Sequence, residues 1–308
     1  MLPHLMEEIM KLENIPTIPA KNIVFRTEIP DKWFGINYNM NIYRGCCHGC
    51  IYCDSRSSCF KNSDFDTVKV KEDALRIIRD DLMRKAITGV VGTGAMSDPY
   101  NPMEKELKLT RNSLELINAF KFGVSLTTKS AMVARDVDIL ADIKDHSPTI
   151  VKFSITTADD DLCRKLEPNV SSTSERFQAM RILADKGIFC GVLIVPLLPF
   201  VNDTEENILE ILRMAKESGA KFVYTYMGMT LRAGSREYYY EHLDSMQSGL
   251  KEKYQKRFGN RFTCLSPRSK KLWSVYIAEC KRLGLLYEMR SIIRHYKAGY
   301  EKAWLKLD

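Results

Sequence analysis

Five cysteines lie within 14 residues, Cys46 to Cys59, and their spacing is that of a metal or cluster site. Cys46, Cys50 and Cys53 form the pattern C-x3-C-x2-C. In a cubane iron–sulfur cluster, three thiolates leave one iron without a protein ligand. Because an iron without a protein ligand can bind a small molecule, this pattern predicts a cluster with a catalytic iron.

A second spacing, C-x2-C-x2-C through Cys47, Cys50 and Cys53, gives two other interpretations. A bacterial ferredoxin requires a further cysteine at position 57 followed by proline, but positions 57 and 58 hold serine. Structural zinc takes four nitrogen or sulfur ligands, and Cys59 or His48 could complete that set. The alternative prediction is therefore a non-catalytic zinc-binding module that binds nucleic acid.

The composition of the 308 residues limits the classes of protein to consider. With 45% apolar and 28% charged residues, the chain is typical of globular proteins. Its nine cysteines, an odd number in a long chain, argue against a disulfide framework. The longest apolar run, Cys190 to Val201, contains two prolines and is too short to cross a membrane. The N-terminal stretch MLPHLMEEIM lacks the pattern of a secretion signal, so we expect a cytoplasmic protein.

The net charge of +7 is unevenly distributed along the chain. Residues 251–308 contain 15 Lys or Arg and 5 Asp or Glu, which gives this segment a charge of +10. Basic side chains interleaved with aromatic ones can bind nucleic acid, so nucleic acid is a candidate partner of this segment. Charge runs also coat solvated helical surfaces, and that interpretation stays open.

The cysteine loop follows the first of several short apolar segments that alternate with helical ones. The expected strands are Asn37 to Tyr43, Val90 to Ala95, Gly123 to Thr127, Val151 to Ile155, Gly191 to Val195 and Phe222 to Met227. The expected helices are Glu72 to Ala86, Glu104 to Phe120, Met132 to Ile143, Thr173 to Lys186 and Asp203 to Ser218, the last with Asp203 and Glu206 as a capping box.

Strand followed by helix, repeated through six strands, predicts an α/β fold with a parallel sheet, in the form of a partial (βα)6 barrel. We expect this barrel core to span residues 37–233, after an irregular N-terminal lead-in of residues 1–36. Residues 234–308 are expected to form an appended, basic and mainly helical C-terminal segment. Ligands of parallel α/β folds bind at the carboxyl ends of the strands, where the cysteine loop lies.

The sequence resembles the radical S-adenosylmethionine (SAM) superfamily, and within it the group allied to spore photoproduct lyase. The resemblance covers residues 41–203 and is carried by the strings NIYRGCCHGCIYC, GAMSDPYNPMEKE, LTTKS, KFSITT, RKLEPNVSSTSERFQAM and GVLIVPLLPFVND. It implies the radical SAM type of partial barrel, with a [4Fe-4S] cluster held by Cys46, Cys50 and Cys53. The fourth iron of that cluster would bind the amino and carboxylate groups of SAM.

The same resemblance implies roles for residues around SAM. Tyr52 would contact the adenine, Lys129 would pair with the SAM carboxylate, and Ser154 would face the ribose. Ile194 is a candidate for contact with the adenine by its position in a strand, and packing in the core of the strand is the favoured alternative.

Two further groups of residues lie where a strand of this fold ends. Gly92 and Gly94 in VVGTGAM lack a Cβ atom and so let the backbone approach a ligand closely. The resemblance implies that the SAM amino group binds there. Asp98 and Tyr100, in the proline-flanked loop DPYNP, are candidates for contact with the substrate, and the alternative for Asp98 is that it caps a turn before Pro99.

The function implied is that of a radical SAM enzyme. With a reductant of the flavodoxin or ferredoxin type, it would cleave SAM reductively and form a 5′-deoxyadenosyl radical that abstracts hydrogen from an unknown substrate. One departure bears on the substrate: spore photoproduct lyase uses a cysteine near its active site as hydrogen donor, and no cysteine lies between Cys59 and Cys163 here.

Overall fold

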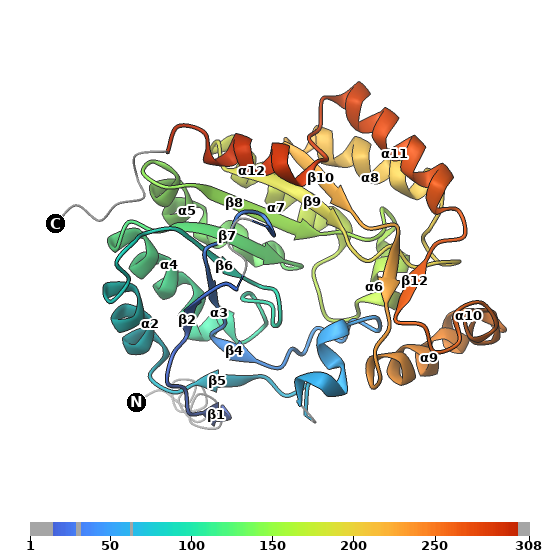
Figure 1. Ribbon diagram of the computed structural model, residues 1–308, viewed down its shortest axis with the longest axis horizontal. Helices are drawn as coiled ribbons and strands as arrows, with labels where there is room; N and C mark the ends of the chain where they lie inside the picture. Colours follow the sequence, from blue (N-terminus) through green and yellow to red (C-terminus); the bar gives the residue numbers. More distant parts are fainter. Residues whose placement is uncertain (1–14, 29–31, 62–63, 301–308) are drawn as a thin grey trace, which may run out of the picture.

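A seven-stranded sheet forms the centre of the computed structural model, which describes residues 15–28, 32–61 and 64–300 (Figure 1). Its strands are β2 (Val24–Arg26), β3 (Tyr38–Met40), β6 (Val90–Thr93), β7 (Gly123–Thr128), β8 (Thr149–Ser154), β9 (Phe189–Ile194) and β10 (Phe222–Thr225). Six of them run parallel in the order β10-β9-β8-β7-β6-β3, and β2 adds an antiparallel strand at the β3 edge. The six parallel strands confirm the expected partial (βα)6 barrel.

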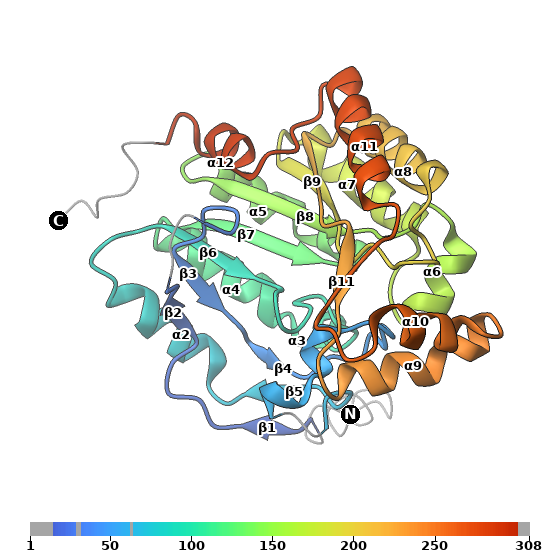
Figure 2. The same ribbon diagram turned by 45° about the vertical axis from the view of Figure 1, so that its right-hand side comes forward.

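Helices connect the parallel strands and cover the outer face of the sheet (Figures 1 and 2). They are α2 (Ala74–Met83), α3 (Glu104–Leu107), α4 (Leu109–Ala119), α5 (Val137–Lys144), α6 (Asp160–Leu166), α7 (Thr173–Asp185) and α8 (Glu205–Glu217). The cap of α8 differs from the expected capping box. Thr204 caps this helix by accepting a hydrogen bond from the Asn207 amide, because Asp203 already accepts hydrogen bonds from the Phe200 amide and the Ser266 hydroxyl.

Two of the expected helices are divided differently in the structure. The expected helix from Glu104 to Phe120 is interrupted at Lys108, whose left-handed φ of 50° separates α3 from α4. The expected helix from Met132 begins as a 3-10 turn, Ala131–Asp136, before α5 starts. α6 was not expected from the sequence.

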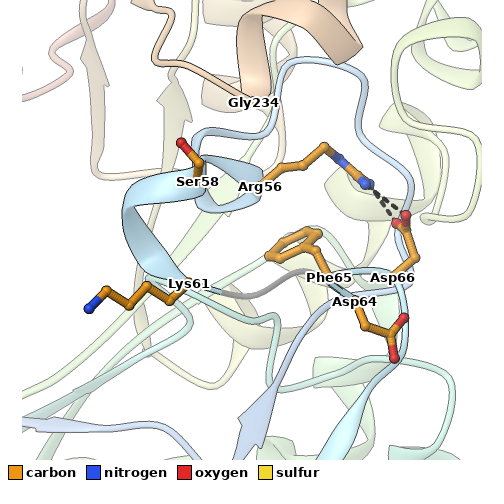
Figure 3. A pocket seen from close by; sticks show the side chains of 7 residues that line it. All are labelled: Arg56, Ser58, Lys61, Asp64, Phe65, Asp66 and Gly234. Carbon is orange, nitrogen blue, oxygen red and sulfur yellow. Dashed lines mark hydrogen bonds and ion pairs between the residues drawn. The ribbon is translucent and has the colours of Figure 1, made fainter.

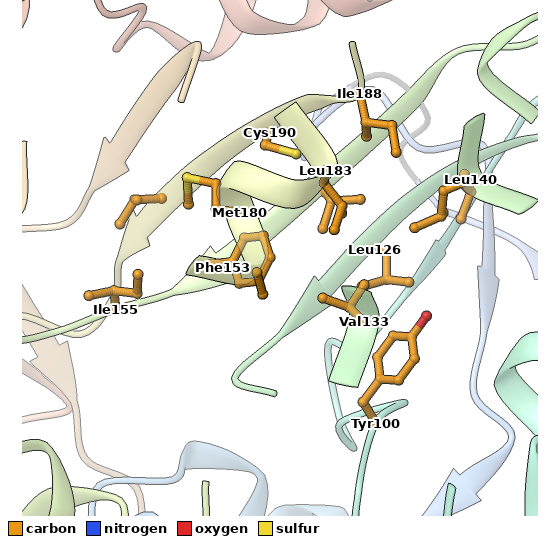
Figure 4. Close-up of a cluster of buried hydrophobic side chains, with 14 of the residues drawn as sticks. Tyr100, Leu126, Val133, Leu140, Phe153, Ile155, Met180, Leu183, Ile188 and Cys190 are labelled. Atoms are coloured by element: carbon orange, nitrogen blue, oxygen red, sulfur yellow. The ribbon is translucent and has the colours of Figure 1, made fainter. Parts of the chain in front are cut away.

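The two sides of the sheet pack in different ways because successive strand residues point to opposite faces. On the outer side, Leu126 and Phe153 pack against helix residues such as Met180 in the main hydrophobic core (Figure 4). On the inner side, Ile150 and Phe222 belong to a separate hydrophobic cluster. The inner residues of β8 that follow Ile150 are therefore available to face the barrel interior.

Segments from near both ends of the chain complete the inner cluster. Phe34, with a left-handed φ of 46°, is fully buried there. Helix α12 (Met289–Lys297) adds Ile292 and Tyr296, and the Tyr296 hydroxyl donates a hydrogen bond of 2.6 Å to the Phe34 carbonyl. These contacts fill the barrel interior near the amino ends of the strands.

The C-terminal segment, expected to be an appended helical part, is packed into the core. It contains α9 (Ser235–Met246), α10 (Leu250–Phe258), α11 (Ser269–Leu283) and α12. Tyr276 of α11 is buried, and its hydroxyl donates a hydrogen bond of 2.6 Å to the Val223 carbonyl in β10. The segment also contains a strand, β12 (Thr263–Leu265), which pairs with β11 (Gly228–Thr230).

The N-terminal lead-in is also more regular than expected. β1 (Thr17–Ile18) pairs with β5 (Lys69–Lys71), which pairs in turn with β4 (Tyr43–Arg44), and β2 extends the main sheet. Strands of two or three residues are too short to show a hydrophobic period. The stretch MLPHLMEEIM, on which the expected absence of a secretion signal rested, lies outside the described residues. No helix in the described part of the chain is long and apolar enough to cross a membrane.

Lys152 is fully buried on the inner face of β8. Its side-chain nitrogen donates a hydrogen bond of 2.6 Å to Ser125 Oγ and lies 4.7 Å from the centre of the Phe34 ring. Burial lowers the pKa of Lys152 from its usual 10.5 to about 7.

The low pKa of Lys152 predicts a pH-dependent stability. Between about pH 7 and 10.5 the unfolded chain binds a proton that the folded chain lacks, so this group's contribution to stability rises with pH in that window. Lys152→Met should therefore be most stabilising at and below pH 7, by up to about 5 kcal/mol, and the gain should shrink towards pH 10. Urea unfolding at several pH values, with Lys256→Met as a surface control, measures this; a gain independent of pH would contradict it.

Candidate active site

One cavity lies where the loops after β4, β6 and β7 meet the end of β8. Its walls combine thiols, one ammonium group and small polar side chains. They are formed by Cys46, His48, Cys50, Tyr52, Cys53, Ser55, Gly94, Ala95, Met96, Ser97, Asp98, Thr127, Thr128, Lys129 and Ser154. The cavity therefore occupies the carboxyl edge of the parallel strands, as expected for this kind of fold.

The structure separates the two cysteine spacings. Cys46, Cys50 and Cys53 line the cavity as free thiols. Cys47 is not among the lining residues; it packs against the main hydrophobic core. Cys59 is exposed and also lies outside the cavity lining. The cavity thus gathers the thiols of the C-x3-C-x2-C pattern.

Asp98 ties together the loops that surround the cavity. Its Oδ1 accepts hydrogen bonds from the Tyr100 amide (2.9 Å) and the Thr128 hydroxyl (2.7 Å). Its Oδ2 accepts a hydrogen bond of 2.7 Å from the Lys129 amide and lies 3.6 Å from His48 Nδ1. The expected substrate residue is therefore engaged in positioning Lys129 and His48.

The thiols and the histidine titrate differently from free side chains. Burial raises the pKa of Cys50 well above its usual value, although the Lys129 ammonium acts in the opposite direction. Burial favours neutral His48, but the Asp98 carboxylate and Cys46 outweigh it and raise the pKa of His48. A buried thiol such as Cys50 releases its proton when a metal cation takes the proton's place.

A buried ion pair supports the cavity from beside β8. Arg176 donates hydrogen bonds to Glu167 Oε2 (2.5 Å) and to the Ser154 carbonyl (2.6 Å). The Tyr52 hydroxyl donates to the other oxygen of Glu167. Burial raises the pKa of Glu167, and Arg176 opposes that rise. The pair thus fixes Tyr52, whose ring lies 5.8 Å from Lys129 Nζ, beside the end of β8.

Three residues predicted for the site lie elsewhere. Tyr100 is buried in the main core near Leu126 (Figure 4), and its hydroxyl donates to Asp136 at 3.0 Å. Gly92 lies deeper in the barrel, where a Cβ would stand 3.0 Å from Ile36. Ile194 belongs to the main core with the outward-facing residues of β9. Their strand and loop positions were right, but the direction of each residue was not visible in the sequence.

Several lining residues were missed or given another role. Thr127 and Thr128 in LTTKS follow the same strand as Lys129, so their position could have indicated them. His48 was considered only as a zinc ligand, and Met96 not at all. The last two carry no signal of their own, since a single histidine or methionine is most often structural.

A second cavity lies beside the cysteine loop (Figure 3). Its prominent cation is Arg56, which donates hydrogen bonds of 2.7 and 2.5 Å to the two oxygens of Asp66. The Arg56 guanidinium also stacks at 3.8 Å from the centre of the Tyr238 ring in α9. These contacts hold the loop after Cys53 against the C-terminal segment.

Comparison with known families decides which class of protein this site represents. The family model described as the radical SAM superfamily matches residues 40–210, more than half of the chain. The chain belongs to the radical SAM superfamily. All the residues predicted to bind the cluster and SAM lie within this matched range.

Two relatives of this radical SAM protein illustrate the range of sequence similarity. An uncharacterized protein of Methanocaldococcus jannaschii is 34% identical over 63% of this chain and 71% of its own. An uncharacterized protein of Mycobacterium tuberculosis is 29% identical over 66% of this chain. The chain spans 61% of the length of this mycobacterial relative.

Solved structures match the fold of this radical SAM protein over most of its length. Spore photoproduct lyase complexed with dinucleoside spore photoproduct has a TM-score of 0.65, with 16% identity and 93% of each chain covered. The radical SAM methyltransferase TsrM of Kitasatospora setae has a TM-score of 0.54, with 12% identity and coverage of 84% of this chain and 54% of its own.

The cofactors of this radical SAM protein are a [4Fe-4S] cluster and SAM. The residues of the cavity fit them: three free thiols converge there, and the burial of Cys50 suits a thiol that binds iron. The Lys129 ammonium stands among the thiols, where it suits both thiolates and the carboxylate of SAM.

Substitution of Gly94 tests how closely the backbone after β6 approaches β7 at the cavity. It has a φ of +92°, and a Cβ would lie 1.9 Å from the Thr127 carbonyl oxygen. Gly249 has a φ of +77° but open space around it. Gly249→Ala should therefore cost only the backbone strain of about 1–2 kcal/mol, whereas Gly94→Ala should cost clearly more and weaken SAM binding. Thermal unfolding and calorimetric titration with SAM measure both effects; equal losses of stability in the two variants would contradict the close approach.

Proposed function

We propose that this radical SAM protein is an enzyme that cleaves SAM reductively and abstracts hydrogen from a bound substrate. The observation that carries the proposal is the convergence of Cys46, Cys50, Cys53 and Lys129 on one cavity at the carboxyl edge of the sheet. The proposal is tested by anaerobic incubation with SAM and dithionite, followed by measurement of 5′-deoxyadenosine.

In the proposed mechanism the three cysteines hold the cluster, and Lys129 binds the carboxylate of SAM. When bound, the cluster and SAM supply an electron and a carbon-centred radical that ordinary side chains do not form. Tyr52 is held by Glu167 beside Lys129 and offers its ring to the adenine. Ser154, at the end of β8, faces the ribose.

Exclusion of water is the second task of the surrounding protein. The inner cluster around Phe34 and α12 fills the barrel interior near the amino ends of the strands. Ligands therefore reach the cavity from the carboxyl edge, and a reactive intermediate is shielded from the opposite side.

The proposed partners follow from the same chemistry. A flavodoxin or ferredoxin would supply the electron, and the nine free thiols suit a reducing cytoplasm. The solved structure of spore photoproduct lyase is a complex with dinucleoside spore photoproduct, and the basic C-terminal segment supports nucleic acid as a partner here. The exposed Phe262 ring of this segment lies 4.7 Å from the guanidinium of Arg232, just before the segment begins, an arrangement suited to stacking with bases. Trp304, another aromatic of this segment, lies outside the described residues.

The zinc-binding alternative lacks support. Two of its proposed ligands, Cys47 and Cys59, lie outside the cavity lined by Cys50 and Cys53. Within the described part of the chain, no three His, Cys, Asp or Glu side chains are grouped closely enough to hold one metal ion. Thiolates of a cubane cluster bind separate iron atoms, so they do not need to crowd around a single ion at about 2.3 Å as zinc ligands do.

The ligand assignment predicts a distinct result for each cysteine variant. Alanine replacement of Cys46, Cys50 or Cys53 should abolish most iron binding after reconstitution, because each removes one thiolate ligand. Cys47→Ala should retain the iron content of the wild type and serves as the matched control. Iron and sulfide analysis measures the outcome; retention of the cluster in Cys50→Ala, or its loss in Cys47→Ala, would show that the register is wrong.

Lys129 should contribute to SAM affinity without holding the cluster. A charge-assisted contact of this kind is worth about 1.5–3 kcal/mol, or roughly ten- to a hundredfold in affinity. Lys129→Met should thus keep the iron content and weaken SAM binding by that factor. Calorimetric titration measures the affinity; an unchanged dissociation constant would assign the SAM carboxylate to another residue.

A further inference from the structure

Another cavity adjoins the cavity that the three cysteines and Lys129 line, which we call the SAM cavity. It lies on the side of the small sheet formed by β1, β5 and β4. It is lined by Ile18, Pro19, Ala20, Asn22, Asn41, Tyr43, Arg44, Gly45, Ser55, Phe60, Phe65, Lys71, Met96 and Ser97. Ser55, Met96 and Ser97 line both cavities, and Ser55 Oγ lies 4.0 Å from Met96 Sδ. We call it the Arg44–Lys71 cavity. A ligand in it would therefore lie directly beside the SAM site.

Two cations face this cavity, and its lining contains no Asp or Glu among the described residues. Arg44, in β4, donates a hydrogen bond of 3.0 Å to the Lys61 carbonyl, which leaves other guanidinium donors for a ligand. Lys71, in β5, has its pKa lowered by burial and by the positive charge of Arg44. The two charges repel one another, so an anion placed between them would be stabilised.

The carboxylate of Asp81 acts electrostatically on Lys71, but it is already engaged in other hydrogen bonds. Asp81 acts to raise the pKa of Lys71, but the net shift is still downward. Its Oδ2 accepts hydrogen bonds from the Ile23 and Val24 amides, and its Oδ1 accepts one from Arg84. Asp81 is 2% exposed and is not a lining residue, so it does not neutralise the cavity.

The cavity of Figure 3 provides a contrast within the same region. It shares Phe65 with the Arg44–Lys71 cavity, but its Arg56 is bonded to both oxygens of Asp66 (Figure 3). Asp64 adds a second carboxylate to that lining. The positive charge there is matched by the protein, whereas that of Arg44 and Lys71 is left for a ligand.

We propose that the Arg44–Lys71 cavity is the substrate pocket and that it binds a phosphate monoester carried on a flat apolar group. This inference rests on the proposed function, because it assigns the substrate of the same active site. A phosphate monoester carries a charge of about −1.5 to −2 at pH 7, which matches two cations. A carboxylate or a phosphodiester carries one charge and would leave one cation unmatched.

The side chains on the cavity walls suit such a ligand. Arg44 can bind phosphate through two parallel hydrogen bonds, while Lys71 supplies a compact point charge. Phe60 and Phe65 offer ring surfaces, and the Met96 thioether adapts to an apolar neighbour. The shared Met96 and Ser55 then place the apolar part of the ligand towards SAM.

Phenyl phosphate is the probe for this pocket, titrated calorimetrically into the reconstituted protein in the presence of SAM. Arg44→Gln and Lys71→Gln should each weaken binding by about tenfold or more, because each removes a charge-assisted contact. Lys69→Gln is the matched control, since Lys69 lies in the same strand but pairs with Asp64 at 3.6 Å and does not line the cavity. The Lys69→Gln variant should bind phenyl phosphate with the affinity of the wild type. Thermal unfolding of each variant shows that the fold is retained.

Two further probes identify the source of the phosphate. Benzoate should bind at least tenfold more weakly than phenyl phosphate, and any binding of a single-stranded oligonucleotide without a terminal phosphate should be insensitive to Arg44→Gln and Lys71→Gln. If the oligonucleotide binds as tightly as phenyl phosphate and loses affinity in both variants, the pocket recognises a nucleic-acid backbone and the monoester proposal is overturned. Equal phenyl phosphate affinity in the wild type and both variants also overturns it.

The failure of this inference can be told apart from a failure of the proposed function. Release of 5′-deoxyadenosine from SAM is measured with the same wild-type preparation in the absence of phenyl phosphate. Lack of that release would count against the proposed function, while the phosphate titration would still report on the pocket. Release of deoxyadenosine without phosphate binding would overturn the pocket assignment alone.

Discussion

The carboxylate of Asp98 is the constraint on which the rest of the site depends. It accepts hydrogen bonds from two backbone amides and the Thr128 hydroxyl and also faces His48, so one side chain joins the loops after β4, β6 and β7. A buried carboxylate is stable only when such donors satisfy it. The loops must therefore adopt their positions together, and the thiols and Lys129 are brought to one cavity as a consequence.

A second set of contacts holds the cysteine loop from the opposite sides. Glu167 and Arg176 bind it through Tyr52 beside β8, while Arg56 stacks on Tyr238 and Arg232 pairs with Asp54 at 3.1 Å. The latter contacts come from residues near the start of the C-terminal segment. This segment is thus part of the support for the cluster loop, in addition to any contact that its basic surface makes with a partner.

Much of the fold and part of the site could be predicted because both follow from local patterns. Six buried strands alternated with amphipathic helices, and the three cysteines, Tyr52, Gly94, Asp98, Lys129 and Ser154 all lie where a strand or its loop reaches the cavity. The direction of a side chain was harder to predict. Tyr100 follows Asp98 closely in a polar loop, yet its apolar ring is buried in the core and its hydroxyl has Asp136 as partner. The strand β2 was missed because three residues are too few to show a hydrophobic period. The inner position of α12 was missed because its partner Phe34 is distant in sequence.

The hydrogen bond between Tyr296 and Phe34 joins residues 262 positions apart. Protein synthesis proceeds from the N-terminus, so Phe34 leaves the ribosome long before its partner exists. The sheet and the cysteine loop can form during that interval. The inner hydrophobic cluster cannot be completed until α12 has been translated. Long-range closure of this kind slows folding because chain entropy is lost before the contact rewards it. In the cell, the nascent chain therefore exposes the apolar interior of its barrel throughout most of translation.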